Sequence, residues 1–434
     1  VNGLLFEPGD ADGLSRHLIA LGSDPVLREQ LGRRLYCRAK AQFSLESTVS
    51  RQLEIYGTIL RRKARPHRKQ DGVLVCGAYG RGNMGDDAIL EAIVAELRAL
   101  DPDLPLRVLS RNPKETRLSY RVNAIYTFAF PRFLHHMRKT RLYINGGGSL
   151  MQDVTSRRSL WFYLFTIWAA KHLGNRVLMY GCGIGPIRHA SNRSLASAIL
   201  QKNVDAITLR DTHSGTELAD MGVTAPQIIL SADPTVILPA APSEVVDGLL
   251  EQHALSPEGR YIAFILRPWP GYEEKIPVFA VAADYAYERH GLTPVFFPIE
   301  PHLDVTAARR VAPLLHVPFH ILEKTGSSAH TIGLLSRMRV VVSMRLHGLV
   351  FAAGQGVPLV GIVYDQKVSS FLSYIGQDLF SDLNVLTADG LRAHIDAACA
   401  RMGDSAFLAA GVARLRQAEG YNSKTAAKLL ELNV

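Results

Sequence analysis

The stretch RVVVSMRLHGLVFAAGQGVPLVGIVYDQKVSSF, residues 339–371, decides the fold. It predicts a buried strand at Val340–Ser343, a polar corner, an apolar helix start and a second buried strand at Leu359–Val363. A strand, a crossing helix and a second strand form one unit of a parallel α/β sheet. The rest of the chain repeats this pattern, so the stretch predicts an α/β fold.

Three side chains of this stretch follow the carboxyl ends of its strands: Arg345, His347 and Lys367. Open α/β sheets bind their ligands at those ends. Arg and Lys suit a phosphorylated or carboxylated ligand, and His can move a proton near neutral pH. A connection with solvated charges explains the same residues, and this stretch alone does not decide between the two.

Composition describes a globular protein. The chain has 434 residues, enough for two or three domains, with 47% hydrophobic and 21% charged residues. Four widely spaced cysteines without a Cys-x-x-Cys pair argue against a disulfide framework or a zinc ribbon, and we expect no metal. We find no signal peptide. Because Val1 is not Met, we expect the chain to begin inside a longer product.

The most apolar run, Leu160–Ala170, is far shorter than the roughly 20 residues of a membrane helix. We expect it to form a buried helix.

The formal charge of +9 is concentrated in RRKARPHRK, which we interpret as part of a basic linker at residues 61–71. Nucleic-acid binding would require aromatic residues or a reading motif beside the charges, and neither is found. Attraction to an anionic membrane surface stays open, so we expect at most peripheral membrane contact.

Residues 1–60 predict a short strand in NGLLFEPGD and helices near Leu14–Leu21, Pro25–Phe43 and Ser47–Leu60. Such a segment encloses little core. NGLLFEPGD resembles the tail of a retaining GT-B glycosyltransferase, in which it follows a donor-binding Glu loop. That loop is absent, so the resemblance implies no glycosyl transfer here but a fused or neighbouring glycosyltransferase as a partner.

An α/β domain is predicted at residues 72–238. Its first strand, Gly72–Gly77, leads through AYGRGNMGDD into an amphipathic helix, and such a loop offers backbone N–H groups to an anion or a sugar hydroxyl. The spacing differs from the dinucleotide fingerprint G-x-G-x-x-G, so we expect no nicotinamide cofactor.

A strand at Arg141–Asn145 is followed by three glycines, residues 146–148, and Ser149. Consecutive glycines are unfavourable in backbone entropy unless the chain must approach a ligand or another backbone closely, or turn tightly. Both explanations stay open. Asp153 follows, where it can cap a helix, orient a ligand hydroxyl or act as a base.

A second α/β domain is predicted at residues 239–434. Its strand Tyr261–Leu266 ends at Arg267, and its last helices, after Ala388, are expected to pack across the domain junction. The predicted architecture is therefore GT-B-like: two Rossmann-type α/β domains facing each other across a cleft, preceded by a small helical segment.

Six motifs then occur in order: GNMGDDAIL (82–90), GGGSLMQDVTS (146–156), GIGPI (183–187), ADP (232–234), SMRLH (343–347) and YDQKVSSF (364–371). Together they resemble the polysaccharide pyruvyl transferase family, most closely its CsaB-type members, over residues 72–377. Asp87 departs from the pattern, because the family more often has Glu there.

The resemblance implies transfer of pyruvate from phosphoenolpyruvate to a sugar, often N-acetylmannosamine (ManNAc), of a lipid-linked cell-wall polysaccharide. It implies a 4,6-linked pyruvate ketal that anchors surface-layer proteins, released phosphate, no cofactor, and a cytoplasmic location peripheral to the inner face of the cell membrane.

The resemblance also implies roles for individual residues. The implied catalytic residues are His347, Arg345 and Lys367. Donor binding is assigned to Arg188, Arg345, Lys367, Leu346 and Arg267, the last from its strand end; acceptor-side candidates are Asn83, Gly85, Asp86, Gly147, Gly148, Ser149 and Asp153. Two alternatives stay open: a glycosyltransferase using a nucleotide-sugar, and a non-catalytic polymer-binding module.

Overall fold

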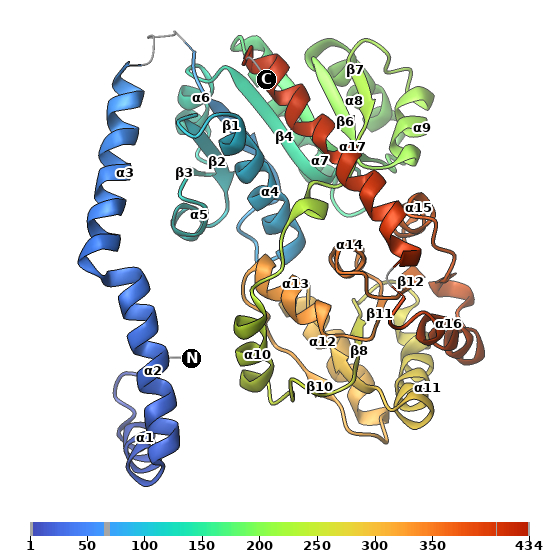
Figure 1. The fold of residues 1–434 in the computed structure, drawn as a ribbon. Helices are drawn as coiled ribbons and strands as arrows, with labels where there is room; N and C mark the ends of the chain where they lie inside the picture. The colour runs from blue at the N-terminus through green and yellow to red at the C-terminus, as the bar shows by residue number, and fades with distance from the viewer. Residues whose placement is uncertain (1–2, 65–69, 405, 433–434) are drawn as a thin grey trace. The chain divides into compact units, whose positions relative to one another are not determined.

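The computed structural model describes residues 3–64, 70–404 and 406–432, and the chain divides into two units, Val1–Arg68 and Lys69–Val434 (Figure 1). The first unit contains three helices: α1 (Ala11–Ser23), α2 (Pro25–Phe43) and α3 (Leu45–Ala64). Asp10 and Asp24 cap the first two by accepting backbone N–H bonds.

Two expectations for this region need correction. The predicted strand near residue 4 is absent from the described residues, because no second strand is present to pair with it. The basic linker predicted at residues 61–71 begins as helix, since α3 continues to Ala64; its residues 65–69 lie outside the described part of the chain.

The second unit begins with a seven-stranded parallel sheet in the order β3-β2-β1-β4-β5-β6-β7. Its strands are β1 (Val73–Cys76), β2 (Leu106–Ser110), β3 (Asn123–Tyr126), β4 (Leu142–Met151), β5 (Arg176–Ile184), β6 (Ala206–Leu209) and β7 (Gln227–Leu230). Its helices are α4 (Met84–Leu100), α5 (Pro113–Tyr120), α6 (Phe130–Met137), α7 (Arg157–His172), α8 (Ala190–Asn203) and α9 (Thr212–Asp220). The short 3-10 helix η1 (Pro234–Ile237) follows the sheet.

The second sheet is also parallel and has the order β10-β9-β8-β11-β12-β13. Its strands are β8 (Tyr261–Ile265), β9 (Thr293–Phe296), β10 (His320–Ile321), β11 (Val340–Ser343), β12 (Leu359–Val363) and β13 (Phe380–Asp382). Its helices are α10 (Ser243–Gln252), α11 (Tyr272–His290), α12 (Pro301–Val311), α13 (Ser328–Ser336), α14 (Leu346–Gly354), α15 (Gln366–Tyr374), α16 (Ala388–Ala400) and α17 (Ala406–Leu430). The short turns η2 (Ala312–Leu314) and η3 (Leu383–Val385) complete it.

The central strands β1, β8 and β11 are buried along their whole length. Parallel sheets covered by helices on both faces require such continuous apolar strands. Each sheet reverses its strand order next to its first strand, and parallel sheets bind ligands at that point.

Helix α17 packs on α4, β5 and β6 of the first sheet and also contacts α14, as Figure 1 shows. Ser231 donates a hydrogen bond to the Ala418 carbonyl, and the Asn422 amide donates one to Ala232. The last helix therefore crosses the domain junction, as predicted.

The predicted end of one strand is wrong. The three glycines lie inside β4 rather than in a loop after it, because β5 pairs with β4 beyond them. Helix α11 begins at Tyr272 and contains Pro277; its buried Tyr272 and Ile276 hold the first turns. Strands β3 and β13 are short edge strands that the sequence pattern did not predict.

Candidate functional site

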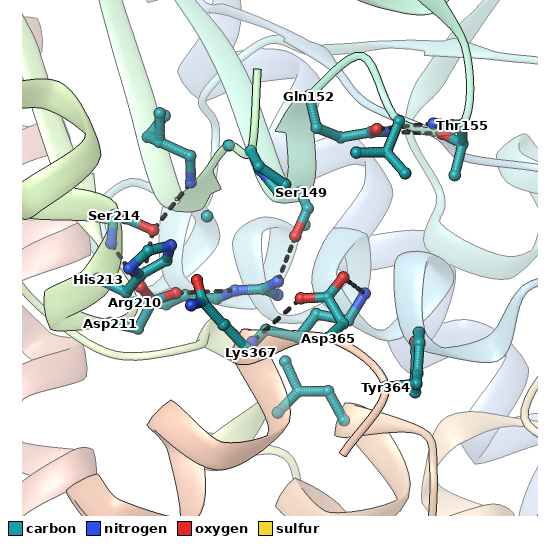
Figure 2. A pocket seen from close by; sticks show the side chains of 18 of the residues that line it. Ser149, Gln152, Thr155, Arg210, Asp211, His213, Ser214, Tyr364, Asp365 and Lys367 are labelled. Carbon is teal, nitrogen blue, oxygen red and sulfur yellow. Dashed lines mark hydrogen bonds and ion pairs between the residues drawn. The ribbon is translucent and has the colours of Figure 1, made fainter. Parts of the chain in front are cut away.

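A cleft of about 500 Å³ lies between the carboxyl ends of the two sheets (Figure 2). Ten residues proposed from sequence line it: Asn83, Asp86, Gly148, Ser149, Arg188, Arg267, Arg345, Leu346, His347 and Lys367. Three others do not line it: Gly85, Gly147 and Asp153. Strand ends from both domains therefore form one site.

His347 lies in the first turn of α14. Its Nε2 atom is buried and has no hydrogen-bond partner in the described part of the chain, and Asp233 Oδ2 lies 3.6 Å from it, beyond hydrogen-bond distance. On the opposite domain, Gly85 is so close that a Cβ atom there would overlap the imidazole. The imidazole is thus held between the two domains, with its buried Nε2 atom beside the Asp233 carboxylate.

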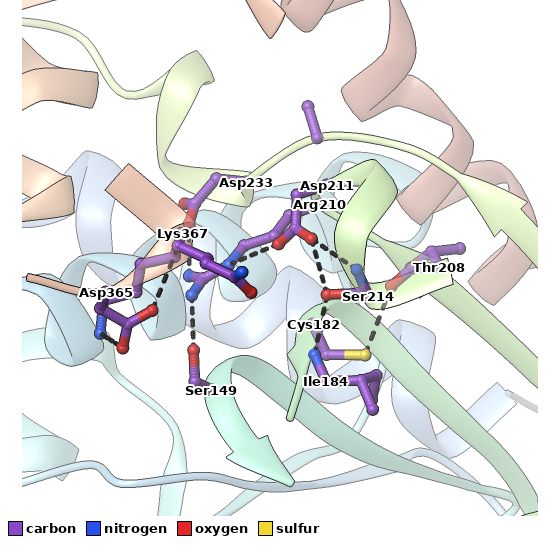
Figure 3. Close-up of polar contacts among 12 residues, drawn as sticks. Ser149, Cys182, Ile184, Thr208, Arg210, Asp211, Ser214, Asp233, Asp365 and Lys367 are labelled. Carbon is purple, nitrogen blue, oxygen red and sulfur yellow. Dashed lines mark hydrogen bonds and ion pairs between the residues drawn. The ribbon is translucent and has the colours of Figure 1, made fainter. Parts of the chain in front are cut away.

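Arg210 bonds to Asp233 within the first domain, and Asp233 lies beside His347 of the second domain. These contacts connect the two walls of the cleft. Figure 3 shows the Arg210 guanidinium donating to Asp233 (2.9 Å) and to the Ser149 hydroxyl (2.8 Å). Burial alone would raise the pKa of Asp233, but His347 and Arg210 outweigh it and hold that pKa well below its ordinary value. Asp233 is therefore an anion beside the imidazole.

The amino end of α14 faces the cleft without a capping side chain, since Arg345 occupies the cap position and makes no such bond. The neighbouring α15 is capped by Asp365, which accepts from the Lys367 N–H. An uncapped helix start presents unsatisfied N–H groups, which suit a phosphate.

Arg345 differs from the expected anion clamp. Its guanidinium donates twice to Asp304, with the Nε bond at 3.0 Å, and pairs with Glu300 at 2.8 Å. Asp304 in turn accepts the N–H groups of Ile299 and Glu300. Two carboxylates balance this guanidinium, so its main contact is the turn before α12 rather than open cleft.

The remaining cations of this wall meet aromatic rings. Arg267 lies over Trp269 and Tyr364, 4.8 and 4.9 Å from the ring centres, and donates to the Tyr364 hydroxyl. Lys367 pairs with Asp365 at 3.3 Å and lies 5.4 Å from the Tyr364 ring centre. Burial raises the pKa of Tyr364, but Lys367 and Arg267 outweigh it and lower the pKa below its ordinary value.

Arg188 is exposed at the rim of the cleft. Its guanidinium makes no hydrogen bond or ion pair with the side chains that the structure describes. It is therefore available to a ligand carboxylate or phosphate.

On the first domain's wall, the Asp86 carboxylate makes no hydrogen bond or ion pair with the residues that the structure describes. Burial raises its pKa, while the nearby His347 opposes the shift. The Asn83 side chain caps α4 by accepting from Gly85 and Asp86. Asp86 therefore has the environment of an acid or base.

The consecutive glycines of β4 have different reasons for lacking a side chain. A Cβ on Gly147 would overlap Ile89 of α4, whereas Gly148 lines the cleft and has room. Both have positive φ, +61° and +70°. Close packing explains Gly147, and access to the cleft explains Gly148.

Asp153 caps the turn before α8, whereas Ser156 caps α7, the helix that Asp153 was expected to open. Its carboxylate accepts from the N–H groups of Arg188 and His189 and from the Asn192 amide. Burial alone would raise the pKa of Asp153, but these hydrogen bonds outweigh it and hold that pKa below its ordinary value. Asp153 stabilises the turn that carries Arg188 and does not line the cleft.

Sequence reasoning did not propose Arg210, Asp233, Asp304 or Tyr364 as site residues. Arg210 and Tyr364 directly follow β6 and β12, and Asp233 lies three residues after β7, so the strand-end rule that selected Arg267 could have found them. Asp304 lies inside α12 and carries no local signal. Among the described residues, no group of three His, Cys, Asp or Glu side chains could hold a metal ion.

Solved structures with the same architecture cover most of the chain. They include Anabaena Alr3699/HepE in complex with UDP-glucose (12% identity, TM-score 0.56, 83% of this chain and 100% of that one). A glycosyltransferase from Rickettsia africae matches at 10% identity and TM-score 0.56, over 84% and 100% of the two chains. A UDP-GlcNAc 2-epimerase from Neisseria meningitidis matches at 13% and 0.57, over 83% and 100%.

These likenesses confirm the GT-B-like fold. A comparison with curated proteins found no match. The family model for polysaccharide pyruvyl transferase matches residues 83–366, which contain the whole cleft lining except Lys367. The chain therefore belongs to the polysaccharide pyruvyl transferase family, and the protein is a transferase.

Proposed function

We propose that the protein transfers pyruvate from phosphoenolpyruvate to a sugar of a lipid-linked cell-wall polysaccharide, releases phosphate, and requires no cofactor. The observation that supports this most is His347: a buried imidazole whose Nε2 atom makes no hydrogen bond with the described residues, at an uncapped helix start and beside the anionic Asp233. That setting combines a proton donor with a phosphate site.

Phosphoenolpyruvate carries a phosphate and a carboxylate. The amino end of α14 and Lys367 suit the phosphate, and Arg188 and Arg267 suit the carboxylate. Arg345 contributes indirectly, because Asp304 and Glu300 already hold its guanidinium and thereby fix the corner that carries His347.

The reaction begins when protonated His347 gives its proton to the methylene carbon, which leaves cationic character on the carbon that bears the phosphate. One sugar hydroxyl attacks that carbon and loses its proton. A second hydroxyl of the same sugar then displaces phosphate and closes the ketal. Two hydroxyl protons leave, one returns to His347, and the other departs with phosphate or a base.

We assign Asp86, on the opposite wall, as the base. Burial raises its pKa and so makes its carboxylate a stronger proton acceptor than that of an ordinary aspartate, and Gly148 and Ser149 leave room beside it for a sugar. We assign the acceptor to this wall and take ManNAc as the first sugar to test.

The proposed product, a 4,6-pyruvate ketal, would carry a negative charge on the polymer and serve as a docking site for surface-layer proteins. Phosphoenolpyruvate is a cytoplasmic metabolite, so the reaction would occur at the inner face of the cell membrane. Among the described helices, none combines the length and apolarity that a membrane crossing requires.

The test is phosphate release from phosphoenolpyruvate by the purified protein, with and without a ManNAc-bearing lipid acceptor and a panel of other sugars. Acceptor-dependent release with a ketal in the product supports the proposal. Parallel reactions contain UDP-glucose or UDP-GlcNAc, since solved proteins of this fold bind these nucleotide-sugars. UDP release without phosphate release would establish a glycosyltransferase instead, and inactivity with both donors would favour a binding module.

A further inference from the structure

A chain of aromatic side chains, here called the aromatic surface, runs over α6, α7 and the end of β3. It comprises Tyr126, Phe128, Phe130, Phe162, Phe165 and Trp168. Neighbouring ring centres lie 6.0 Å apart for Tyr126 and Phe128, 5.6 Å for Phe128 and Phe162, and 5.9 Å for Phe130 and Phe165. The rings are therefore continuous rather than scattered.

This surface is open to solvent. Tyr126, Phe128 and Trp168 are each 43% exposed and Phe130 is 39% exposed. The prediction that Leu160–Ala170 forms a buried helix is thus right for only one face of α7, where Leu160, Leu164 and Ile167 enter the core. Large exposed apolar areas of this kind mark interaction sites.

The charges around the aromatic surface are almost all positive. Residues 126–176 contain eight Arg and Lys residues and one acidic residue, Asp153, which is buried as a cap. Arg111 also lies over Phe128, 4.5 Å from the ring centre. Lys171 and Arg176 pair with Asp205. Five further cations of this segment are exposed: Arg132, Arg138, Lys139, Arg157 and Arg158.

The surface adjoins the cleft. Val154 and Thr155 line the cleft, and α7 starts two residues later. Phe162 is five residues beyond the start of α7 at Arg157, which corresponds to about 7.5 Å along the helix. A ligand anchored against the aromatic surface could therefore extend its polar end into the cleft.

Exposed aromatic side chains surrounded by basic residues suit an anionic lipid bilayer. The interface of a bilayer accommodates Trp and Tyr rings, and its anionic headgroups attract Arg and Lys. Single-stranded nucleic acid also uses rings and cations, but it requires open ring faces for stacking. Here the rings pack against one another, and Arg111 covers Phe128.

We propose that the aromatic surface docks the protein on an anionic membrane, with the mouth of the cleft held near the headgroups. The binding itself stands on the surface alone; its purpose, delivery of a membrane-held acceptor, rests on the proposed function.

The test is sedimentation of the full chain with vesicles of phosphatidylcholine alone or mixed with phosphatidylglycerol. The probe variant carries Phe128→Glu and Trp168→Glu. The matched control carries Val385→Glu and Tyr421→Glu, which alter apolar residues elsewhere in the second unit that are even more exposed, 73% and 47%. Wild type and control should bind mixed vesicles, and the probe variant should bind at least about tenfold more weakly, with thermal unfolding unchanged from the control.

Three results would overturn the docking proposal: no binding by wild type, equal binding to neutral vesicles, or full binding by the probe variant. A dimer that the probe variant converts to monomers would show that a second copy covers the surface. Phosphate release with a water-soluble sugar acceptor should be unchanged in the probe variant. If no preparation releases phosphate while the vesicle results hold, the proposed function fails and the docking surface stands.

Discussion

The two walls of the cleft arise from equivalent strand ends of two parallel sheets, yet they carry different chemistry. The second domain presents cations and an imidazole: Arg267, Arg345, His347 and Lys367. The first domain presents small residues, hydroxyls and a carboxylate, Gly148, Ser149 and Asp86, with two arginines, Arg188 and Arg210, beside them. A cationic wall suits a small dianion, and a small-residue wall with a carboxylate suits a sugar.

The difference shows that the fold supplies the place and the strand-end residues supply the specificity. It also identifies the contacts that connect the two walls. Asp233 and Arg210 belong to the first domain but set the electrostatics of His347 on the second. The walls are therefore one site only while His347 stays against Asp233 and Gly85.

The largest effect is expected from His347→Gln, which removes the proton donor of the cationic wall. General acid–base groups contribute about 10² to 10⁴ in rate, so turnover should fall within or beyond that range while phosphoenolpyruvate binding persists. Phosphate release and calorimetric titration measure the two properties. His213→Gln alters another imidazole of the cleft lining and should retain most activity. Near-normal ketal formation by the His347 variant would exclude this residue as the acid.

Asp86→Asn tests the opposite wall and should lower turnover by about 10². Because burial raises the pKa of Asp86, the carboxylate form that accepts a proton is lost at a higher pH than for an ordinary aspartate. Wild-type activity should thus rise with pH through that raised pKa, and the variant should lack this rise.

Asp87→Asn is the matched control for this measurement. Burial raises the pKa of Asp87 to about 6 although the Gly80 N–H opposes it, and Asp87 is outside the cleft lining. The Asp87 variant should keep the pH dependence of the wild type. An unchanged pH profile in the Asp86 variant would assign the base elsewhere.

Gly85→Ala tests the contact between the walls. The added Cβ would overlap the His347 ring, so either the imidazole or α4 must shift. We expect a turnover loss of about tenfold or more, because small displacements of catalytic groups have large effects on rate. In the helical Gly215, by contrast, a Cβ would meet Leu209 at an ordinary 3.7 Å, and Gly215→Ala should be close to wild type. Equal activity of both variants would show that the contact tolerates movement.

The sequence predicted the second domain's core with high accuracy, since β11 and β12 begin and end where expected. Continuous apolar runs bounded by polar corners are the signal of buried parallel strands. The first domain was harder to predict, because three glycines interrupt the apolar pattern before the end of β4, and β3 is a half-exposed edge strand. The strand-end positions of Arg345, His347 and Lys367 were predicted, but the pairing of Arg345 with Asp304 depends on tertiary packing and leaves no local pattern.

The smallest effect is expected at Glu419 of α17, which lies across the joint between the domains. Burial, together with Glu96, raises the pKa of Glu419 from 4.5 to about 8, and the Asn422 amide donates to its carboxylate. Between these pH values the folded protein holds a proton that the unfolded chain has lost. The free energy of unfolding should therefore fall as pH rises through this window, by up to about 1.4 kcal/mol for each pH unit.

Glu419→Gln mimics the protonated side chain, so its stability should stay flat over the window and exceed that of the wild type near pH 8. Urea unfolding at pH 5 and pH 8 measures the difference, and activity should change little because Glu419 is outside the cleft lining. Glu258→Gln, on an exposed turn before β8, is the control and should leave the slope unchanged. If the Glu419 variant loses stability with pH as steeply as the wild type, α17 contains no such buried acid, and its apolar packing and its hydrogen bonds with Ser231 and Ala232 hold the junction without one.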